Sequence, residues 1–166
     1  MIVCFDVHYQ DDSAVAAAIL FESWQDTEPT RQFTVRVPDI GAYQPGSFYQ
    51  RELKPLLAAV NQIQEDVDCF VIDAYCHLSE DLSPGLGSYF HEQLSETATV
   101  IGVAKNRFRD TTHAIELYRG ESQKPLFVTS IGIEYSKAAE LIGSMAGEHR
   151  IPTLLKSVDR LCRDAI

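Results

Sequence analysis

Short apolar runs recur along this chain, and two of them carry an aspartate where a buried strand would be expected to carry none. Asp6 interrupts the run that begins at Ile2, and Asp73 closes the run that begins at Cys69. A carboxylate at the end of a buried strand costs free energy unless another charge compensates it. A divalent cation can be that charge, because such ions prefer oxygen ligands. The two aspartates therefore constrain both the fold and the chemistry of the chain.

The N-terminal part of the chain has the pattern of three consecutive strands. Residues 1–9 are rich in β-branched and aromatic side chains and end before a turn-like sequence at 10–13. Residues 14–21 fit a second buried strand, although their alanines leave a helix open as an alternative. Residues 32–37 alternate apolar and polar side chains and stop at Pro38. Together these segments predict an antiparallel meander.

The rest of the chain alternates helical and strand patterns. Leucines at helical spacing follow a proline- and glycine-rich loop at 39–47, and residues 68–73 have the pattern of a central parallel strand buried on both faces. The other predicted elements are helices at 85–96, 135–146 and from Pro152 to about Arg163, and strands at 99–104, 114–118 and 126–130. A β-β-β meander followed by α-β-α-β is the order of a ribonuclease H-like α/β fold, with helices flanking a central mixed sheet. At 166 residues we expect a single domain, 1–166.

The composition is that of an ordinary globular protein, with 45% hydrophobic and 23% charged residues. We find no apolar stretch of bilayer-spanning length and no signal-peptide pattern, because Asp6 interrupts the first apolar run. We therefore expect a cytoplasmic protein without a membrane partner. Cys4, Cys69, Cys76 and Cys162 lack zinc-like spacing, and we expect them to act as small apolar residues.

The formal net charge of −10 argues against a nucleic-acid partner. The basic residues concentrate beyond residue 100, however, and include Lys105, Arg107, Arg109, Arg119 and Lys124. Divalent cations held by carboxylates would also invert the local charge. DNA or RNA therefore stays open as a partner.

Three acidic residues are placed to meet at one edge of the predicted sheet. Alternation along the first strand puts Asp6 and His8 on one face. Glu52 precedes Leu56 by four residues and so follows the core-facing stripe of its helix. Asp73 lies at the carboxyl end of its strand, where α/β sheets place ligands. Three such carboxylates suit two Mg²⁺ or Mn²⁺ ions roughly 4 Å apart that bridge a phosphate; the alternative is that some of them are caps or strand ends in solvent.

The sequence around these acids resembles the endonuclease V family over almost the whole chain. The family has an aspartate on its first strand, a P-Y-[IV]-P-G wedge followed by F-R-E, a D-G strand end and an I-G-V-A-K strand. The corresponding segments here are Phe5-Asp6-Val7, Tyr43-x-Pro45-Gly46-x-x-x-x-Arg51-Glu52, Val71-Ile72-Asp73, Ile101-Gly102-Val103-Ala104-Lys105 and the closing Arg150-Ile151-Pro152-Thr153.

This resemblance implies a Mg²⁺- or Mn²⁺-dependent endonuclease that recognises deaminated adenine (inosine) in DNA or RNA. Such an enzyme cuts one phosphodiester bond further along on the 3′ side. The resemblance makes Asp6, Glu52 and Asp73 the metal ligands and places Lys105 beside the scissile phosphate, as catalytic residues.

The same resemblance assigns a nucleic-acid surface to the segment before and at the start of the first helix. Tyr43 and Pro45 would belong to a wedge that separates the strands around the lesion, since an aromatic ring can stack into opened bases. Gly46 and Arg51 of the same motif would also contact the nucleic acid.

Two departures from the family pattern bear on activity. The segment Asp73-Ala74-Tyr75-Cys76 stands where the family has D-G-[QH]-G, whose glycines let the backbone approach the extruded base. Ile133 stands where we align the histidine of the family's V-S-x-G-H, which assists at the metal site. His8 is a candidate replacement for that imidazole, although a histidine on a strand is more often structural.

Two other functions stay open. One is a catalytically impaired relative that acts as a nucleic-acid or protein binding module, which would explain the substituted histidine, the altered 73–76 segment and the net acidity. The other is a nuclease-fold protein with a small phosphoester substrate, which predicts a closed pocket above Asp6 and Asp73 rather than an open basic groove.

Overall fold

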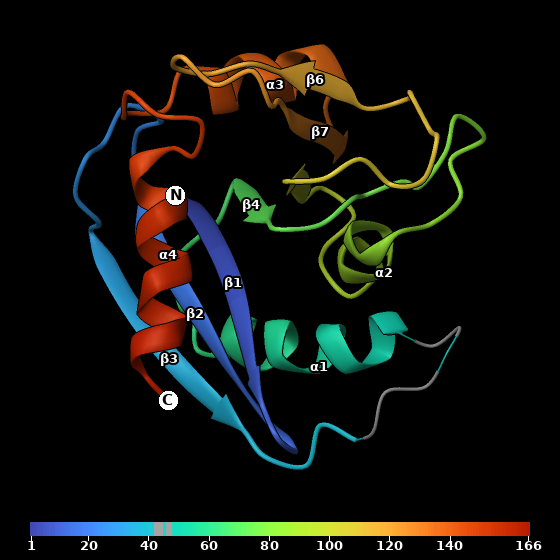
Figure 1. Ribbon diagram of the computed structural model, residues 1–166. Helices are drawn as coiled ribbons and strands as arrows, with labels where there is room; N and C mark the ends of the chain where they lie inside the picture. The colour runs from blue at the N-terminus through green and yellow to red at the C-terminus, as the bar shows by residue number, and fades with distance from the viewer. Residues whose placement is uncertain (42–44, 46–47) are drawn as a thin grey trace.

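The computed structural model describes residues 1–41, 45 and 48–166, and its strands form one mixed sheet (Figure 1). The strands are β1 (Ile2–Gln10), β2 (Ser13–Phe21), β3 (Arg31–Val37), β4 (Cys69–Ile72), β5 (Thr99–Ala104), β6 (Ile115–Leu117) and β7 (Leu126–Ile131). Their order across the sheet is β3-β2-β1-β4-β5-β7-β6. The central strands β1, β4 and β5 are parallel, and the flanking pairs are antiparallel. The predicted meander and the central position of β4 are both present.

The alanine-rich run 14–21 is a strand, not a helix, and this follows from the burial of both its faces. Ala17 and Ile19 pack into one apolar cluster of the core, while Ala16 and Ala18 pack into the cluster on the other side. A strand buried on both faces needs a continuous apolar run rather than an alternating one. Small alanine side chains also let helices approach both faces of the sheet closely.

Helices cover the two faces of the sheet in pairs, with α4 on one side of β1 and α1 on the other (Figure 1). Their bounds are α1 (Phe48–Val60), α2 (Leu86–Glu92), α3 (Tyr135–Gly143) and α4 (Thr153–Asp164). Apolar side chains of α1 and α2 share one cluster, and those of α3 and α4 share the other. Within the described part of the chain, no helix is long and apolar enough to cross a membrane.

Two helices are shorter than the sequence predicts. The prediction extended α2 to residue 96, but the chain leaves the helix after Glu92 in tight turns, with the amide of Leu94 donating to the carbonyl of His91. These turns return the chain to the sheet at Thr99. The prediction extended α3 to residue 146, but the helix ends at Gly143, where the hydroxyl of Ser144 donates to the carbonyl of Leu141.

Candidate active site

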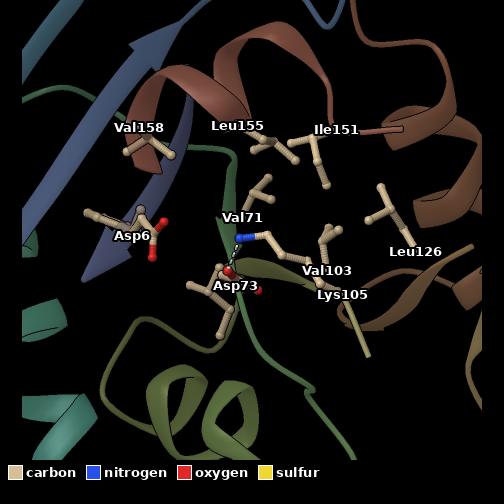
Figure 2. A pocket seen from close by; sticks show the side chains of 11 residues that line it. Asp6, Val71, Asp73, Val103, Lys105, Leu126, Ile151, Leu155 and Val158 are labelled. Carbon is tan, nitrogen blue, oxygen red and sulfur yellow. Dashed lines mark hydrogen bonds and ion pairs between the residues drawn. The ribbon is translucent and has the colours of Figure 1, made fainter. Parts of the chain in front are cut away.

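The site lies where β1 and β4 separate. Their parallel register ends at the pair Phe5 and Ile72, so Asp6 and Asp73 follow at the point where the two strands diverge. The carboxyl ends of parallel strands are the usual place for ligands in such sheets. Lys105 follows the last residue of the neighbouring strand β5 and reaches the same edge. Figure 2 shows the three side chains around one hollow, with a dashed line from Lys105 to Asp73.

Glu52 reaches this edge from α1, on the opposite face of the sheet from α4. It lines a cleft of about 340 Å³ together with Asp6 and Asp73. The structure therefore brings together three acidic side chains that are far apart in the sequence. Tyr9, near the end of β1, lines the same cleft.

The charges in the cleft are unevenly compensated. The ammonium of Lys105 donates a hydrogen bond of 2.6 Å to Oδ2 of Asp73. Burial, the negative charge of Asp73 and a hydrogen bond with Asp159 raise the pKa of Asp6 to about 7. Burial and Asp73 likewise raise the pKa of Glu52 to about 7. Two carboxyls thus hold protons more tightly than usual, because burial and the charge of Asp73 outweigh the effect of the nearby cations Lys105 and Arg51.

A fourth carboxyl, Asp159 of α4, belongs to the site and was missed in the sequence. Its side chain is within hydrogen-bonding reach of Asp6, and Nε of Arg163 donates to its two oxygens at 3.1 and 3.2 Å. The helical spacing could have identified it, because Asp159 follows Leu155 by four residues and precedes Cys162 by three. It therefore lies on the core-facing stripe of its helix, by the same argument that selected Glu52.

The donor set suits a hard divalent cation. Among the residues that the structure describes, no three His, Cys, Asp or Glu side chains already form a group that would hold a metal ion. Carboxylate oxygens are nevertheless the ligands that Mg²⁺ and Mn²⁺ prefer, and a cation would offset the burial and the repulsion by Asp73 that raise the pKa values of Asp6 and Glu52. Asp6, Glu52 and Asp73 could hold such an ion, with Asp159 beside them.

Comparison with known proteins identifies the family. The sequence profile described as "Endonuclease V" matches residues 1–124. This chain belongs to the endonuclease V family. Endonuclease V of Nocardia farcinica is 29% identical to it, in an alignment that covers 94% of this chain and 77% of the relative.

Solved endonuclease V structures share its ribonuclease H-like fold, which confirms the fold predicted from the sequence. The enzyme of Streptomyces avermitilis superposes with a TM-score of 0.78 at 25% identity, covering 99% of this chain and 80% of that one. Endonuclease V of Ciona intestinalis, solved in complex with a 24-mer DNA that contains an inosine, superposes with a TM-score of 0.77 at 17% identity. The superposition covers 99% of this chain and 84% of that one.

The position compared above with the family's histidine lies at the wrong end of the sheet. Val100 at the start of β5 pairs with Ile131, so Ile133 lies near the amino end of β5, while Lys105 follows its carboxyl end. A six-residue strand separates the two ends by roughly 15 Å. Ile133 packs into the apolar cluster under α3 and α4. Ile133 therefore lies outside the candidate active site. His8 is not among the described residues that line the cleft.

The altered segment 73–76 directs its larger side chains away from the cleft. Cys76 is fully buried, and a Cβ on Gly87 of α2 would come within 2.6 Å of its sulfur. The hydroxyl of Tyr75 donates to the carbonyl of Asn106 at 2.7 Å, and its ring packs near Phe127. Cys76, at the position of a family glycine, and Tyr75, at the [QH] position, are therefore accommodated without filling the space beside the carboxylates.

The predicted nucleic-acid contacts are only partly within the described chain. Tyr43 and Gly46 lie outside the described residues, and Pro45 lies in an exposed turn. Arg51 lies over the ring of Tyr9, with its guanidinium carbon 5.0 Å from the ring centre. The expected basic cluster includes one residue that is not available to a ligand, since Arg119 is only 7% exposed.

Proposed function

We propose that this member of the endonuclease V family is a divalent-metal-dependent endonuclease acting on DNA or RNA. Its substrate bond would be the phosphodiester on the 3′ side of a deaminated base, inosine. The observation that carries the proposal is the cleft lined by Asp6, Glu52 and Asp73, which shares Asp6 and Asp73 with an adjoining hollow lined by Lys105. The inosine-containing DNA bound by the Ciona intestinalis relative supports the choice of substrate.

The three carboxylates would hold Mg²⁺ or Mn²⁺ and Asp159 would orient Asp6. Such an ion supplies Lewis-acid stabilisation of a phosphoryl oxygen and an activated water. Deprotonation of Asp6 and Glu52 must accompany cation binding, because protonated carboxyls are poor ligands.

Lys105 would hold a phosphate oxygen at the edge of the cleft. Although burial alone would lower its pKa, the hydrogen bond and charge of Asp73 outweigh this and raise it, so the ammonium stays charged at neutral pH. A compact charge on a flexible stem can move from Asp73 to a phosphate oxygen without leaving the cleft.

A binding module without catalytic activity has less support. The features behind that hypothesis are Ile133, the altered segment 73–76 and the net acidity. Ile133 lies at the other end of the sheet, and Tyr75 and Cys76 are absent from the lining of the cleft. A small phosphoester substrate has no separate observation in its favour.

The proposal is tested by cleavage of single- and double-stranded DNA and RNA with and without one inosine, in Mg²⁺ or Mn²⁺. We expect a cut on the 3′ side of inosine that disappears with EDTA and in Asp73→Asn. Asp68→Asn is a matched control, because Asp68 precedes the same strand, is exposed and pairs with the N-terminal amine at the other edge. No metal-dependent cutting of any substrate would overturn the enzyme function, and equal cutting without inosine would overturn the specificity.

A further inference from the structure

Two tyrosines, Tyr49 of α1 and Tyr89 of α2, form the closest aromatic contact between described residues. Their ring centres lie 3.7 Å apart, and their planes differ by 12°. Other ring pairs in the described chain, such as Phe5 and Phe70, are separated by about 6 Å. We call Tyr49 and Tyr89 the tyrosine stack.

The tyrosine stack lies one helical turn from the candidate active site. Tyr49 precedes Glu52 by three residues on α1, and Tyr89 follows Leu86 by three residues on α2. Residues three apart lie on the same face of a helix. Glu52 and Leu86 both line the cleft that contains Asp6, and α1 packs against α2, so the stack lies one helical turn beyond this lining.

The stack is not part of the packed interior. Both tyrosines are only partly buried, and neither is found in the apolar clusters formed by the described residues. Two aromatic side chains by themselves prefer an offset or edge-on arrangement with centres roughly 4.5–7 Å apart. The close parallel overlap of Tyr49 and Tyr89 instead resembles the spacing between stacked nucleobases.

The net negative charge of the protein affects how it would bind nucleic acid. The chain carries a formal charge of −10, and the cleft itself is acidic. Contacts to phosphates therefore contribute less to affinity than in a basic nuclease, and base stacking, which is insensitive to net charge, can compensate.

We infer that the tyrosine stack binds a nucleobase of the substrate, next to the phosphate that enters the cleft. The base continues the column formed by the two rings. This inference rests on the proposed function only in taking nucleic acid as the ligand. The two residues hold the nucleotide strand beside the carboxylates and take no part in bond cleavage.

Binding without metal tests this inference separately from cleavage. The probe is a single-stranded, inosine-containing DNA with 2-aminopurine placed in turn on either side of the inosine, titrated in EDTA. Stacking quenches 2-aminopurine, so wild type is expected to quench it at one of the two positions. Tyr49→Phe and Tyr89→Phe keep a ring and should quench as wild type does, whereas the double variant Tyr49→Leu, Tyr89→Leu should not.

An abasic site at the quenched position provides the second measurement. Loss of the base should weaken wild-type binding roughly 5- to 100-fold, the range expected for one stacked base. The same change should have little effect on the double leucine variant, because neither ring remains for the base to stack on. The wild-type measurement does not depend on any variant and so remains decisive if a leucine variant fails to fold.

The outcomes distinguish this inference from the nuclease proposal. Absence of quenching at both positions, or an equal abasic penalty in wild type and the double leucine variant, overturns the tyrosine stack as a base-binding site, whatever the cleavage assay gives. Quenching and a wild-type abasic penalty in a protein that never cuts would support the stack and overturn the nuclease.

Discussion

Lys105 and Asp73 form an ion pair of 2.6 Å in which each side chain is about one-third exposed. A pair of this exposure contributes at most about 1 kcal/mol to folding. Lys105→Met should therefore leave the Tm nearly unchanged, while loss of the charge beside the phosphate lowers kcat by about 100-fold or more. Single-turnover cleavage and thermal unfolding measure the two effects. Lys124→Met, at an exposed loop position, is the control, and wild-type cleavage rates in Lys105→Met would refute the role given to Lys105.

Asp159 differs from Asp164, the other acid of α4, because it contacts Asp6. Removal of its charge in Asp159→Asn should weaken Mn²⁺ binding by roughly 10- to 100-fold, the usual effect of losing a residue that orients a ligand. Calorimetric titration with Mn²⁺ measures this directly. Asp164→Asn is the matched control, since Asp164 lies on the same helix and pairs only with exposed Arg160. Equal affinities in the two variants would exclude Asp159 from the site.

Single site residues can be predicted from the sequence where a charged side chain occupies a position that should be buried. Asp6 and Asp73 stand out because each belongs to an apolar run, and Glu52 because it follows a helical stripe. Asp159 obeys the same rule as Glu52, because it lies on the core-facing stripe of α4. The register of β5 with β7 places Ile133 a strand length away from the active site. Strand pairing of this kind cannot be predicted from the local sequence pattern.

The connection between α3 and α4 depends on one buried guanidinium. Arg119 donates to the carbonyls of Met145 at 2.7 Å, Gly147 at 3.1 Å and His149 at 2.6 Å. Arg119→Met should leave these acceptors without a donor and lower the free energy of unfolding by about 3 kcal/mol. Urea unfolding measures the loss. Arg160→Met, an exposed change on α4, should cost less than about 1 kcal/mol, and similar losses in the two variants would contradict the structural role of Arg119.

Element types follow from the sequence more readily than element neighbours do. Thr99–Ala104 is predicted to the residue because a continuous apolar run is bounded by polar segments on both sides. The insertion of β7 between β5 and the shorter β6 is not predictable in the same way, since it depends on long-range pairing. Helix ends were also misplaced, because the turns after Glu92 are set by the distance back to the sheet.

For the whole molecule, the raised pKa values of Asp6 and Glu52 couple stability to pH. Both carboxyls have a pKa of about 7 in the folded protein, whereas an unfolded chain titrates them near 4. The folded state therefore binds more protons between these values, and its stability is full below about pH 4 and is lost as the pH rises through about 7. Without metal we expect the Tm to fall from pH 5 to pH 8 by roughly 3–10 °C, which corresponds to about 1–3 kcal/mol.

A divalent cation should remove much of this loss, because it binds the ionised carboxylates and not the protonated ones. Millimolar Mg²⁺ or Mn²⁺ is expected to raise the Tm at pH 8 and to have little effect at pH 5, as measured by scanning calorimetry at matched ionic strength. The double variant Asp6→Asn, Glu52→Gln keeps the other titrating groups, including His77, whose pKa burial lowers. Its pH dependence should be flatter than that of wild type, and its Tm should not respond to the cation. Parallel curves for the two proteins would show that these carboxyls do not cause the pH dependence of stability. An equal response to the cation at pH 5 and pH 8 would show that they do not bind the metal.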